Sequence, residues 1–538
     1  MAEAAAFDLK SHAARMSRAW SGKAAWDAIL CEAHEYAIPF RRPSVAQGQR
    51  RGDRVFDSTA IDSTFRGAGQ LKEDLFPSNQ DWFRLAAGPL TKRLIKSSRD
   101  GDTVAFNQGL QDLTDQILPH FQTGEFDLAA SEMCLDLFAS TGILLPVPGD
   151  DATPVRFVCL PADECALTMD GHRRVNGLSW RRMWTKRDLR EAFPDASWPD
   201  GFWQGHNENP DAEVLLYQDF VKEGARWRCL ARLDDTSAPP LRMWWRKAQP
   251  FVAARYHVVP GEVYGRGPIM LALPTIKVLN KVQEMTLRSA AINLLGLWGY
   301  RPGGAFNPDV HRMQPGAFWP VNSTGGLMGP DVTRLDPSGR ALDTSSIITG
   351  ELRAIVQRLL HDEQTPGKGK TPVSAEEILL HIQKVKAAYL GAFGRLINEI
   401  VPVIVPAVAE ILYEKHLLTT ELTIDQLLLG VEVVSPLASA LRADHMQPLI
   451  QFIQLLAAAG QQIGRYVPLD TVLPELAAVM GVPARWIATA DQRQAFDQQQ
   501  ALQQAAAVAA EMAVKNPELV TGEAAGQDGN VVPMRGAA

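Results

Sequence analysis

The chain has 538 residues, of which 54 are Lys or Arg and 61 are Asp or Glu, so its formal net charge is −7. Hydrophobic residues make up 46% and charged residues 21% of the chain, an ordinary globular composition that excludes wholesale disorder. At about 100–200 residues per domain, this length predicts several substructures rather than one compact core.

The five cysteines do not form a recognisable framework. None stands in a C-x-x-C pair, and they are widely spaced, at Cys31, Cys134, Cys159, Cys165 and Cys229. Disulfide scaffolds and zinc sites both need closer, matched spacing, so we expect reduced thiols and no structural metal. This pattern is typical of a protein whose thiols stay reduced in a cytoplasm.

Two features argue against a membrane partner. The first residues carry charges throughout and lack the apolar core of a signal peptide. No uncharged apolar run reaches the roughly 18 residues that a spanning helix needs. The best candidate, residues 400–412, contains Pro402, Pro406 and Glu410 and is interpreted as a buried, kinked helix.

Residues 1 to about 145 are predicted to be helical around a central loop. Helical spacing runs from Asp8 to Tyr36, where the prolines that follow end it. A second helix is expected over residues 57–75, before the turn at Pro77, and a further helical block over residues 102–141. The loop between the first two helices is basic, with Arg41, Arg42, Arg50, Arg51 and Arg54.

From about residue 153 to 263 the apolar period changes from helical to alternating. Short strands are predicted at 155–158, 174–180, 214–217, 227–230 and 251–254. Tryptophans and arginines are interspersed here, a pattern that base stacking by a nucleic-acid binder would also use. Alternation alone already predicts a half-buried sheet with Trp inward and Arg toward solvent, and we favour that interpretation.

A pair of helices around an irregular segment is the main feature of the next region. After Pro274, a helix without internal Pro or Gly is predicted from Thr275 to about Leu295. At about 1.5 Å per residue it would span about 30 Å. Residues 296–345 are rich in Gly and Pro and are expected to form a small protruding module. With a second helix over residues 346–362, these parts would form a hairpin stalk with a head at its tip.

The first of these helices carries four charged side chains, Lys277, Lys281, Glu284 and Arg288, at helical spacing. Because residues at i, i+4, i+7 and i+11 return to the same side of a helix, the four share one face with a net positive charge. A solvated face of a bundle helix and a functional surface explain this pattern equally well.

The loop at residues 363–373 carries Lys368 and Lys370 between glycines and prolines. It is either an exposed connector or a mobile positive segment that contacts phosphates transiently. Ser374 then begins the longest helix as the N-cap of a capping box with Glu377, and this helix runs to about His416. The remainder is predicted to contain a strand at 431–434, helices at 444–459, 469–480 and 490–514, and a fraying tail from residue 516.

Motifs for enzyme chemistry are missing or incomplete. Gly369-Lys370-Thr371 looks like the end of a phosphate-binding loop, but Gln364 stands where the first glycine is required. The glycine pairs at 265–267 and 367–369 lack the third glycine of a dinucleotide site. The chain has no H-E-x-x-H and no G-x-S-x-G, so we predict no enzyme, no bound cofactor and no metal.

Three local sequences occur in an order that resembles a known family. They are Phe65-Arg66-Gly67-Ala68-Gly69-Gln70-Leu71 through Leu75-Phe76-Pro77 to Asp81-Trp82-Phe83-Arg84-Leu85, then Tyr264-Gly265-Arg266-Gly267-Pro268, then Thr371-Pro372-Val373-Ser374-Ala375-Glu376-Glu377-Ile378. With the order of elements, they make the chain resemble the head-to-tail connector (portal) proteins of short-tailed double-stranded DNA bacteriophages over nearly its whole length.

The resemblance implies an α+β, predominantly α subunit that assembles into a cyclic ring of twelve at one capsid vertex of the virion. It implies a wing (1–263), a stem (264–295 and 346–362), a clip (296–345), a tunnel loop (363–373), a long wing helix with a returning strand (374–439), a crown (440–515) and a flexible tail (516–538). The implied role is a channel for double-stranded DNA packaging and ejection. The implied partners are double-stranded DNA, the major capsid protein, the scaffolding protein, the terminase large subunit and tail adaptor proteins.

The acidic composition suits a conduit better than a tight DNA binder. Many simultaneous phosphate contacts would hold the duplex, whereas a few positive side chains guide it weakly. On this interpretation the residues that face the DNA channel are Lys368 and Lys370 of the tunnel loop and Lys277, Lys281 and Arg288 of the stem.

Two other functions are alternatives. A metal-dependent nucleic-acid-processing enzyme would need clustered carboxylates, for which Asp163/Glu164 and Asp234/Asp235 are the candidates. Both pairs lie in predicted turns without a partner motif. A scaffold or tail-adaptor protein is the second alternative, but such proteins are typically smaller and lack a paired-helix stalk.

Overall fold

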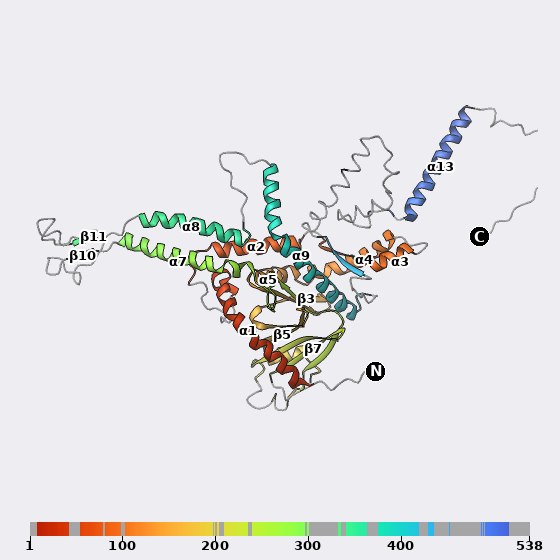
Figure 1. Ribbon diagram of the computed structural model, residues 1–538. Helices are drawn as coiled ribbons and strands as arrows, with labels where there is room; N and C mark the ends of the chain where they lie inside the picture. Colours follow the sequence, from red (N-terminus) through yellow and green to blue (C-terminus); the bar gives the residue numbers. More distant parts are fainter. Residues whose placement is uncertain are drawn as a thin grey trace, which may run out of the picture. The chain divides into compact units, whose positions relative to one another are not determined.

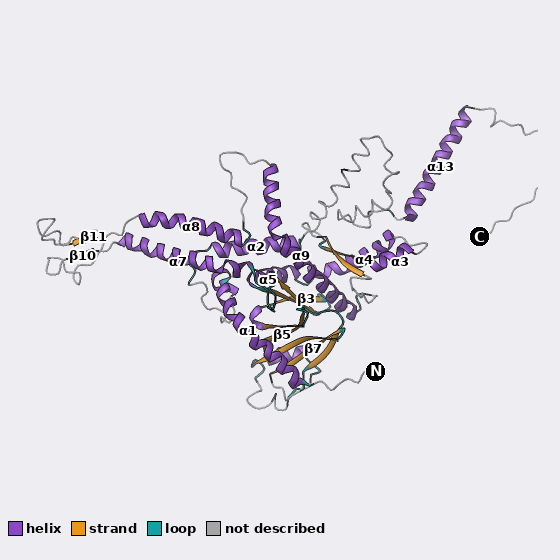
Figure 2. Cartoon of the chain, in the orientation of Figure 1, coloured by secondary structure: helices purple, strands orange, loops and turns teal. Residues whose placement is uncertain are grey.

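The computed structural model describes most of the chain up to residue 434 and one helix beyond it (Figures 1 and 2). The described residues are 8–41, 54–78, 81–97, 103–196, 198–199, 202–203, 209–234, 239–295, 298–300, 332–334, 340–362, 375–418, 429–434, 451, 486, 488 and 490–515. They belong to two compact units, one of residues 1–85 and 113–441 and the other of residues 86–112 and 442–538. The sites discussed below lie in the first unit.

Three helices from the start of the chain pack together: α1 (Leu9–Ala37), α2 (Thr59–Leu75) and α5 (Phe126–Ala139). The side chain of Asp8 caps α1 by accepting from the backbone N of Lys10 at 3.0 Å, and the helix ends before Pro39, as predicted. A short 3-10 helix, η1 (Pro39–Arg41), follows it. The predicted block at 102–141 is instead α4 (Thr103–Thr123) and α5. The chain turns between them at Glu125, which adopts a left-handed backbone conformation with φ of 60°. The preceding Gly124 is tightly packed, since an added Cβ would be 2.4 Å from the carbonyl oxygen of Val155.

The strands form two larger antiparallel sheets. One has the order β3-β2-β9, from β2 (Thr141–Pro148), β3 (Val155–Leu160) and β9 (Val252–Arg255). The other has the order β4-β5-β6-β7-β8, from β4 (Cys165–Met169), β5 (Val175–Thr185), β6 (Glu213–Glu223), β7 (Arg226–Leu233) and β8 (Arg242–Arg246). The short η2 (Ala162–Glu164) precedes β4, and α6 (Lys186–Ala192) follows β5. Side chains of both sheets, among them Leu145, Leu178 and Ala253, pack into one apolar cluster.

All five strands predicted between residues 153 and 263 are present, but three other strands of these two sheets were not predicted. β4 and β8 are short and lie within the region expected to be β-rich. β2 lies at the boundary where helix was expected, because its apolar run from Thr141 to Val147 does not alternate. It is the middle strand of its sheet and is buried on both faces, and such strands have no period-2 signal.

The half-buried sheet explains the alternation of Trp and Arg only in part. Trp180 and Trp227 are buried in the apolar cluster, as predicted. Arg232 and Arg246 are buried as well, and the Nε of Arg232 donates to the buried carboxylate of Asp219 at 2.8 Å. The expectation that arginines face solvent is therefore wrong at these two positions, where carboxylate partners replace water.

Three long helices follow the sheets: α7 (Pro268–Leu295), α8 (Arg340–Leu359) and α9 (Ala375–Glu414). α7 begins before the predicted start, and Pro274 lies inside it instead of preceding it. The buried side chains of Ile269 and Ala272 keep these first turns helical despite the proline. α8 also begins earlier than predicted and takes in residues that had been assigned to the clip.

The last half of α9 is a core helix. Residues Gly394–Glu414 are long and apolar enough by composition to cross a membrane, with a mean hydropathy of 1.7, but 56% of this stretch is buried inside the structure. Ile400, Ile404 and Val408 are fully buried, and α9 contacts β9 and β2. The predicted burial of this proline-containing helix is confirmed.

The end of the chain is described only in part. β12 (Leu429–Val433) is the predicted strand and pairs with β1 (Phe83–Ala87). In the second unit, the described helices include α3 (Pro89–Ser97) and α13 (Ala490–Lys515), and α13 matches the predicted helix at 490–514. The predicted helices at 444–459 and 469–480 and the tail from residue 516 lie outside the described residues.

All five cysteines are free thiols, as predicted, and four of them are buried. Burial raises the pKa of Cys134 and of Cys229 to about 12. Thiols that stay protonated at neutral pH are weak nucleophiles and weak metal ligands.

Candidate functional site: a paired-helix stalk

Helices α7 and α8 lie side by side and form a stalk (Figure 1). Beyond α7, β10 (Trp298–Tyr300) pairs antiparallel with β11 (Val332–Arg334), which precedes α8, so a small β-element lies at the tip. Along the stalk, the hydroxyl oxygens of Thr286 and Ser345 are 2.5 Å apart and share a hydrogen bond. The predicted neighbouring helices beneath a small element are confirmed, whereas residues 301–331 lie outside the described residues.

The segment before α2 clamps both stalk helices at their base. Asn280 of α7 is buried, its Nδ2 donates to the carbonyl oxygen of Arg54 at 2.7 Å, and its Oδ1 accepts from the backbone N of Phe56 at 2.7 Å. One residue further, Asp57 accepts two hydrogen bonds from Arg353 of α8. Because α7 and α8 both bind this one segment, the base of the stalk is fixed by polar contacts; we call these residues the polar clamp.

The end of α8 is also fixed. The carboxylate of Asp362 accepts from the hydroxyl of Ser63 at 2.9 Å and lies 3.8 Å from the guanidinium of Arg66, and both partners are on α2. His361 adopts a left-handed backbone conformation with φ of 60°, which turns the chain out of the helix. The point from which the predicted tunnel loop departs is therefore held against α2.

Two sequences that carry the resemblance place glycines where backbones meet around Phe138. A Cβ added to Gly67 of α2 would lie 2.6 Å from the carbonyl oxygen of Leu360 and 2.8 Å from the Phe138 ring. A Cβ added to Gly267, which precedes α7, would lie 1.9 Å from the carbonyl oxygen of Phe138. Only glycine allows α2 and the start of α7 to approach α5 and the end of α8 this closely.

The three stem cations predicted to face DNA all have carboxylate partners. Lys277 contacts Glu32 of α1, and both Lys281 and Arg288 contact Glu284, with Lys281 at 2.9 Å. Three cations thus share two carboxylates, and the surface carries a small positive excess. Lys368 and Lys370 lie outside the described residues.

An apolar stripe runs along the outside of α7. Its members recur every seven residues and are exposed: Leu271, Val278, Met285 and Ile292. Val278 is 52% and Met285 58% exposed, whereas Ile276 and Leu279 of the same helix are buried. Because seven residues are close to two helical turns, these four side chains lie on the same side of α7, with the exposed Lys281 and Arg288 between them, and we call the four the α7 stripe. Exposed apolar side chains gathered on one side of an element are typical of an interaction site.

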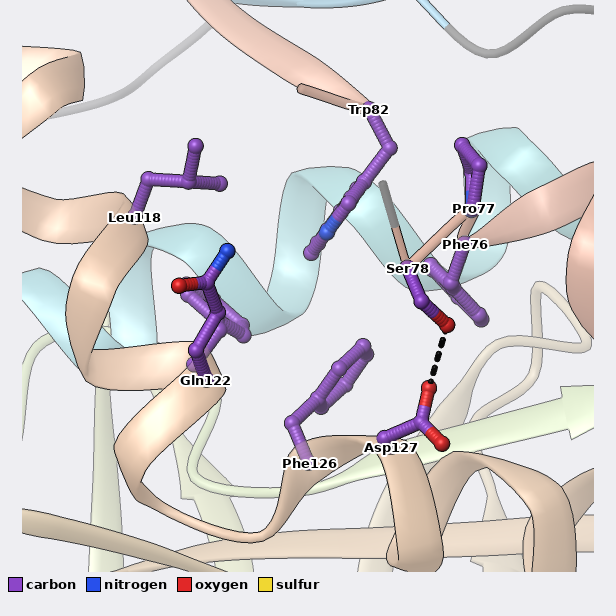
Figure 3. Close-up of a pocket in the computed structure, with 9 residues that line it drawn as sticks. Phe76, Pro77, Ser78, Trp82, Leu118, Gln122, Phe126 and Asp127 are labelled. Atoms are coloured by element: carbon purple, nitrogen blue, oxygen red, sulfur yellow. Dashed lines mark hydrogen bonds between the residues drawn. The ribbon is translucent and has the colours of Figure 1, made fainter. Parts of the chain in front are cut away.

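The Phe76-Pro77 and Trp82 parts of the first sequence line an aromatic cavity of about 220 Å³ (Figure 3). Trp82 points into it and stacks with Phe126, with ring centroids 5.5 Å apart. At its edge the hydroxyl of Ser78 donates to Asp127 at 2.9 Å. Asp127 is the one titratable group among the lining residues, so this motif serves packing rather than chemistry.

The carboxylate pairs considered for metal chemistry do not converge. Among the described residues, no group of three or more His, Cys, Asp or Glu side chains is placed to hold a metal ion. Glu164 accepts from the indole Nε1 of Trp180 at 3.0 Å. Asp234 lines a cavity that contains no other acid and hydrogen-bonds with Tyr217, and Asp235 lies outside the described residues.

Sequence reasoning missed the polar clamp and the α7 stripe. Asn280, Asp57 and Arg353 are far apart in the chain and carry no shared local signal. The seven-residue spacing of the stripe is visible in the sequence, and it was the signal that could have indicated a second apolar face on this helix.

An anchored stalk with an exposed apolar stripe is typical of a subunit built for assembly. The profile of a family described as bacteriophage head to tail connecting protein matches residues 9–487. The chain therefore belongs to the bacteriophage head-to-tail connecting protein family, which is a family of structural connectors and not of enzymes. No curated protein matches the chain significantly.

Solved structures with similar chains come from gene transfer agent (GTA) particles. One is a chain of the virion of a native GTA particle, with 15% identity over 77% of this chain and 90% of that chain and a TM-score of 0.28. A chain of the neck of an empty GTA particle has 14% identity over 81% of this chain and 95% of that chain, with a TM-score of 0.30. A chain of the neck of a native GTA particle has 14% identity over 79% of this chain and 92% of that chain, with a TM-score of 0.27. With TM-scores this low, these likenesses carry no argument about the function of this chain.

Proposed function

We propose that this chain is a portal subunit, of which twelve copies form a ring at one capsid vertex of the virion. The ring would enclose the channel through which double-stranded DNA is packaged and later ejected. Support comes from membership of the head-to-tail connector family and from one structural observation, the anchored stalk with the exposed α7 stripe. A rod that is fixed at its base and apolar along its outside gains most by packing against neighbouring copies.

The ring contact that we propose joins the α7 stripe of one subunit to α8 of the next. α8 exposes Ile347, Ile348 and Ile355 around the exposed Glu351, whereas Lys281 borders the stripe. Contacts around a cyclic ring join two different surfaces of each subunit. Two apolar surfaces with opposite charges beside them suit such a contact.

In this proposal the channel wall guides DNA weakly. Lys277, Lys281 and Arg288 would line the channel, and Lys368 and Lys370 of the tunnel loop would lie nearest to the duplex. Because the stem cations share carboxylate partners, they would give the wall little net charge. Weak attraction lets the duplex slide, since each strong phosphate contact would have to be broken at every step.

The remaining partners follow from the same proposal. The tip with β10 and β11 would belong to the clip (296–345), which docks the terminase large subunit during packaging and tail adaptor proteins afterwards. The wing (1–263) would contact the major capsid protein and the scaffolding protein, and the crown (440–515) would complete the ring. The subunit would be made in the host cytoplasm and reside in the virion.

Negative-stain imaging and mass photometry of the purified chain test the ring. We expect rings near twelve times 59.1 kDa for the natural sequence. The double variant Val278→Glu/Met285→Glu should stay monomeric, because charges would be buried in each contact. Leu128→Glu is the control, since Leu128 is 61% exposed on α5 rather than on a stalk helix, and this variant should form rings as the natural chain does.

These experiments test the portal assignment and the proposed ring contact separately. A natural chain that stays monomeric at every concentration would overturn the portal assignment. Rings that form equally well with Val278→Glu/Met285→Glu would overturn the α7 stripe as the contact and leave the ring itself standing.

A further inference from the structure

A polar cavity lies between α1 and the five-stranded sheet, in a part of the unit that the stalk does not use. Its volume is about 660 Å³, within the range of small-ligand sites. α1 contributes Lys10, Ser17 and Trp20 to its lining, and the sheet contributes Arg181, Tyr217 and Arg232. Cations, hydroxyls and an aromatic ring are thus gathered around one space.

The three sheet residues form a row across neighbouring strands. Arg181 of β5 pairs with Tyr217 of β6, and Tyr217 pairs with Arg232 of β7. Directly paired residues point to the same face of a sheet. Two guanidinium groups and a phenolic hydroxyl therefore face α1 side by side.

Of the two arginines, Arg232 is neutralised and Arg181 is not. The Nε of Arg232 donates to the buried carboxylate of Asp219 at 2.8 Å. The guanidinium of Arg181 lies over the ring of Trp20, 3.7 Å from its centroid, and no described residue gives it a hydrogen bond or a carboxylate. Trp20 is itself held by a hydrogen bond from its Nε1 to Ser179 at 3.1 Å. Stacking fixes the plane of the Arg181 guanidinium and leaves the N–H groups at its edge free to donate.

The local charge favours an anion of limited charge. Lys10 adds a second cation, and Asp234 is the one carboxylate among the lining residues. With Asp219 beneath Arg232, three cations meet two carboxylates, so one positive charge is in excess in a chain with a net charge of −7. Burial, the charge of Asp234 and a hydrogen bond to Asp234 raise the pKa of the Tyr217 hydroxyl, which stays protonated and donates to that carboxylate.

We propose that this cavity binds a single oxyanion group, a phosphate or a carboxylate, carried by a small molecule. Arg181 would donate two hydrogen bonds in a fork and Lys10 would supply the second positive charge, with a hydroxyl donor at Ser17. Duplex DNA does not fit this chemistry, because Asp234 would repel the phosphates next to the bound one. The cavity is larger than one ion, which leaves space for the body that carries the anion. This site is independent of the portal proposal.

Isothermal titration calorimetry of the full chain tests the site, with inorganic phosphate and glutarate as the two probes. We expect at least one probe to bind and Arg181→Gln to weaken its affinity about tenfold or more. Lys10→Gln should weaken it less, because a lysine offers a point charge without a fork. Arg182→Gln is the matched control, because Arg182 is the next residue of β5 and is exposed. The substitution removes the same charge, and the variant should bind the probe as the natural chain does.

Each result has a definite meaning. Tighter binding of phosphate or of glutarate identifies which oxyanion the cavity prefers, and either supports the site. Binding of neither probe, equal losses in Arg181→Gln and Arg182→Gln, or displacement of the probe by short duplex DNA would overturn it. Thermal unfolding and ring imaging of Arg181→Gln complete the test, since we expect a folded protein with unaltered rings. A parallel loss of folding and binding would assign Arg181 to the fold and overturn the ligand role.

Discussion

Asp57 accepts two hydrogen bonds from Arg353, from Nε at 2.9 Å and from Nη2 at 2.7 Å, and so joins the start of α2 to the middle of α8. Burial alone would raise the pKa of Asp57. The hydrogen bonds from Thr59 and Arg353 and the charge of Arg353 outweigh burial and lower the pKa below its usual value of 3.8. Folding therefore favours the ionised carboxylate.

Replacing Arg353 with Met should lower the free energy of unfolding by about 1–2 kcal/mol at neutral pH, because a buried carboxylate loses two charge-assisted hydrogen bonds to a partly exposed partner. Since the folded pKa lies below the unfolded one, this stabilisation is fully present above the unfolded value near 3.8 and is lost as the pH falls through the folded pKa. The urea midpoint of the natural chain should therefore fall more steeply below about pH 4 than that of Arg353→Met.

A surface ion pair provides the control for this prediction. Arg187 and Asp211 are 2.8 Å apart with both side chains mostly exposed, so Arg187→Met should change the urea midpoint little at any pH. Parallel pH profiles for the natural chain and Arg353→Met would contradict the role of the Asp57 pair.

Gly67 and Gly69 offer a matched test of packing at the stalk base, because they are two residues apart on α2. An added Cβ at Gly67 would lie 2.6 Å from the Leu360 carbonyl oxygen, whereas nothing lies within 4 Å of one at Gly69. Gly67→Ala must displace α8 or α5 and should cost about 1–3 kcal/mol. Gly69→Ala should stabilise α2 by about 0.5–1 kcal/mol. Thermal unfolding of the two variants tests this prediction. Changes of the unfolding temperature in the same direction for both variants would contradict the close packing at Gly67.

How much of the fold the sequence predicts depends on whether the signal is local. α1, α2 and α13 lie within a few residues of the bounds that their sequence pattern predicts. β2 lacks the alternating pattern of a strand because it is buried on both faces. Pro274 was predicted to precede the helix, but α7 begins at Pro268, where the buried side chain of Ile269 stabilises the first turn. Both errors arise from tertiary packing, which local periodicity does not report.

For the candidate site too, the sequence predicts the features that have a local signal and misses those that depend on tertiary contacts. The stalk is predictable because two helical periods flank a segment rich in Gly and Pro. The polar clamp is not, because Asp57 and Arg353 are 296 residues apart and only the fold brings them together. On α7, apolar residues at helical spacing form both the exposed α7 stripe and a buried face with Ile276 and Leu279. The sequence alone therefore does not show which of the two apolar faces is buried.

Trp82 should be among the most important residues for stability in the helical part of the first unit. It is almost fully buried and contacts the rings of Phe76, Phe121 and Phe126, with centroids 4.9, 5.2 and 5.5 Å away. Trp82→Ala would enlarge the adjoining cavity and should cost about 3–5 kcal/mol in urea unfolding. Trp245→Ala is the control, since Trp245 is 45% exposed on β8 and should cost less than about 1 kcal/mol. Similar losses in both variants would show that the aromatic cluster is not a special source of stability.

Replacing Lys368 and Lys370 together with Ala should impair DNA packaging and leave the rings intact. In the portal proposal these side chains lie nearest to the duplex, and each phosphate contact adds about one unit to the slope of log affinity against log salt. An in vitro packaging assay across salt concentrations should therefore show less retained DNA and a slope lower by about 2 for each subunit that contacts the duplex. Replacing Lys277 should have a smaller effect, because Glu32 already compensates its charge.

The matched control removes the same charge from the five-stranded sheet. Arg182 and Lys222 are both exposed there, on β5 and β6, and Arg182→Ala/Lys222→Ala should package DNA as the natural chain does. A general electrostatic effect would lower packaging equally in both double variants, because the net charge of the ring changes by the same amount. A specific loop contact lowers it only when Lys368 and Lys370 are replaced. Packaging at the natural level by the loop variant would remove these two lysines from the channel and leave guidance of the duplex to the stem.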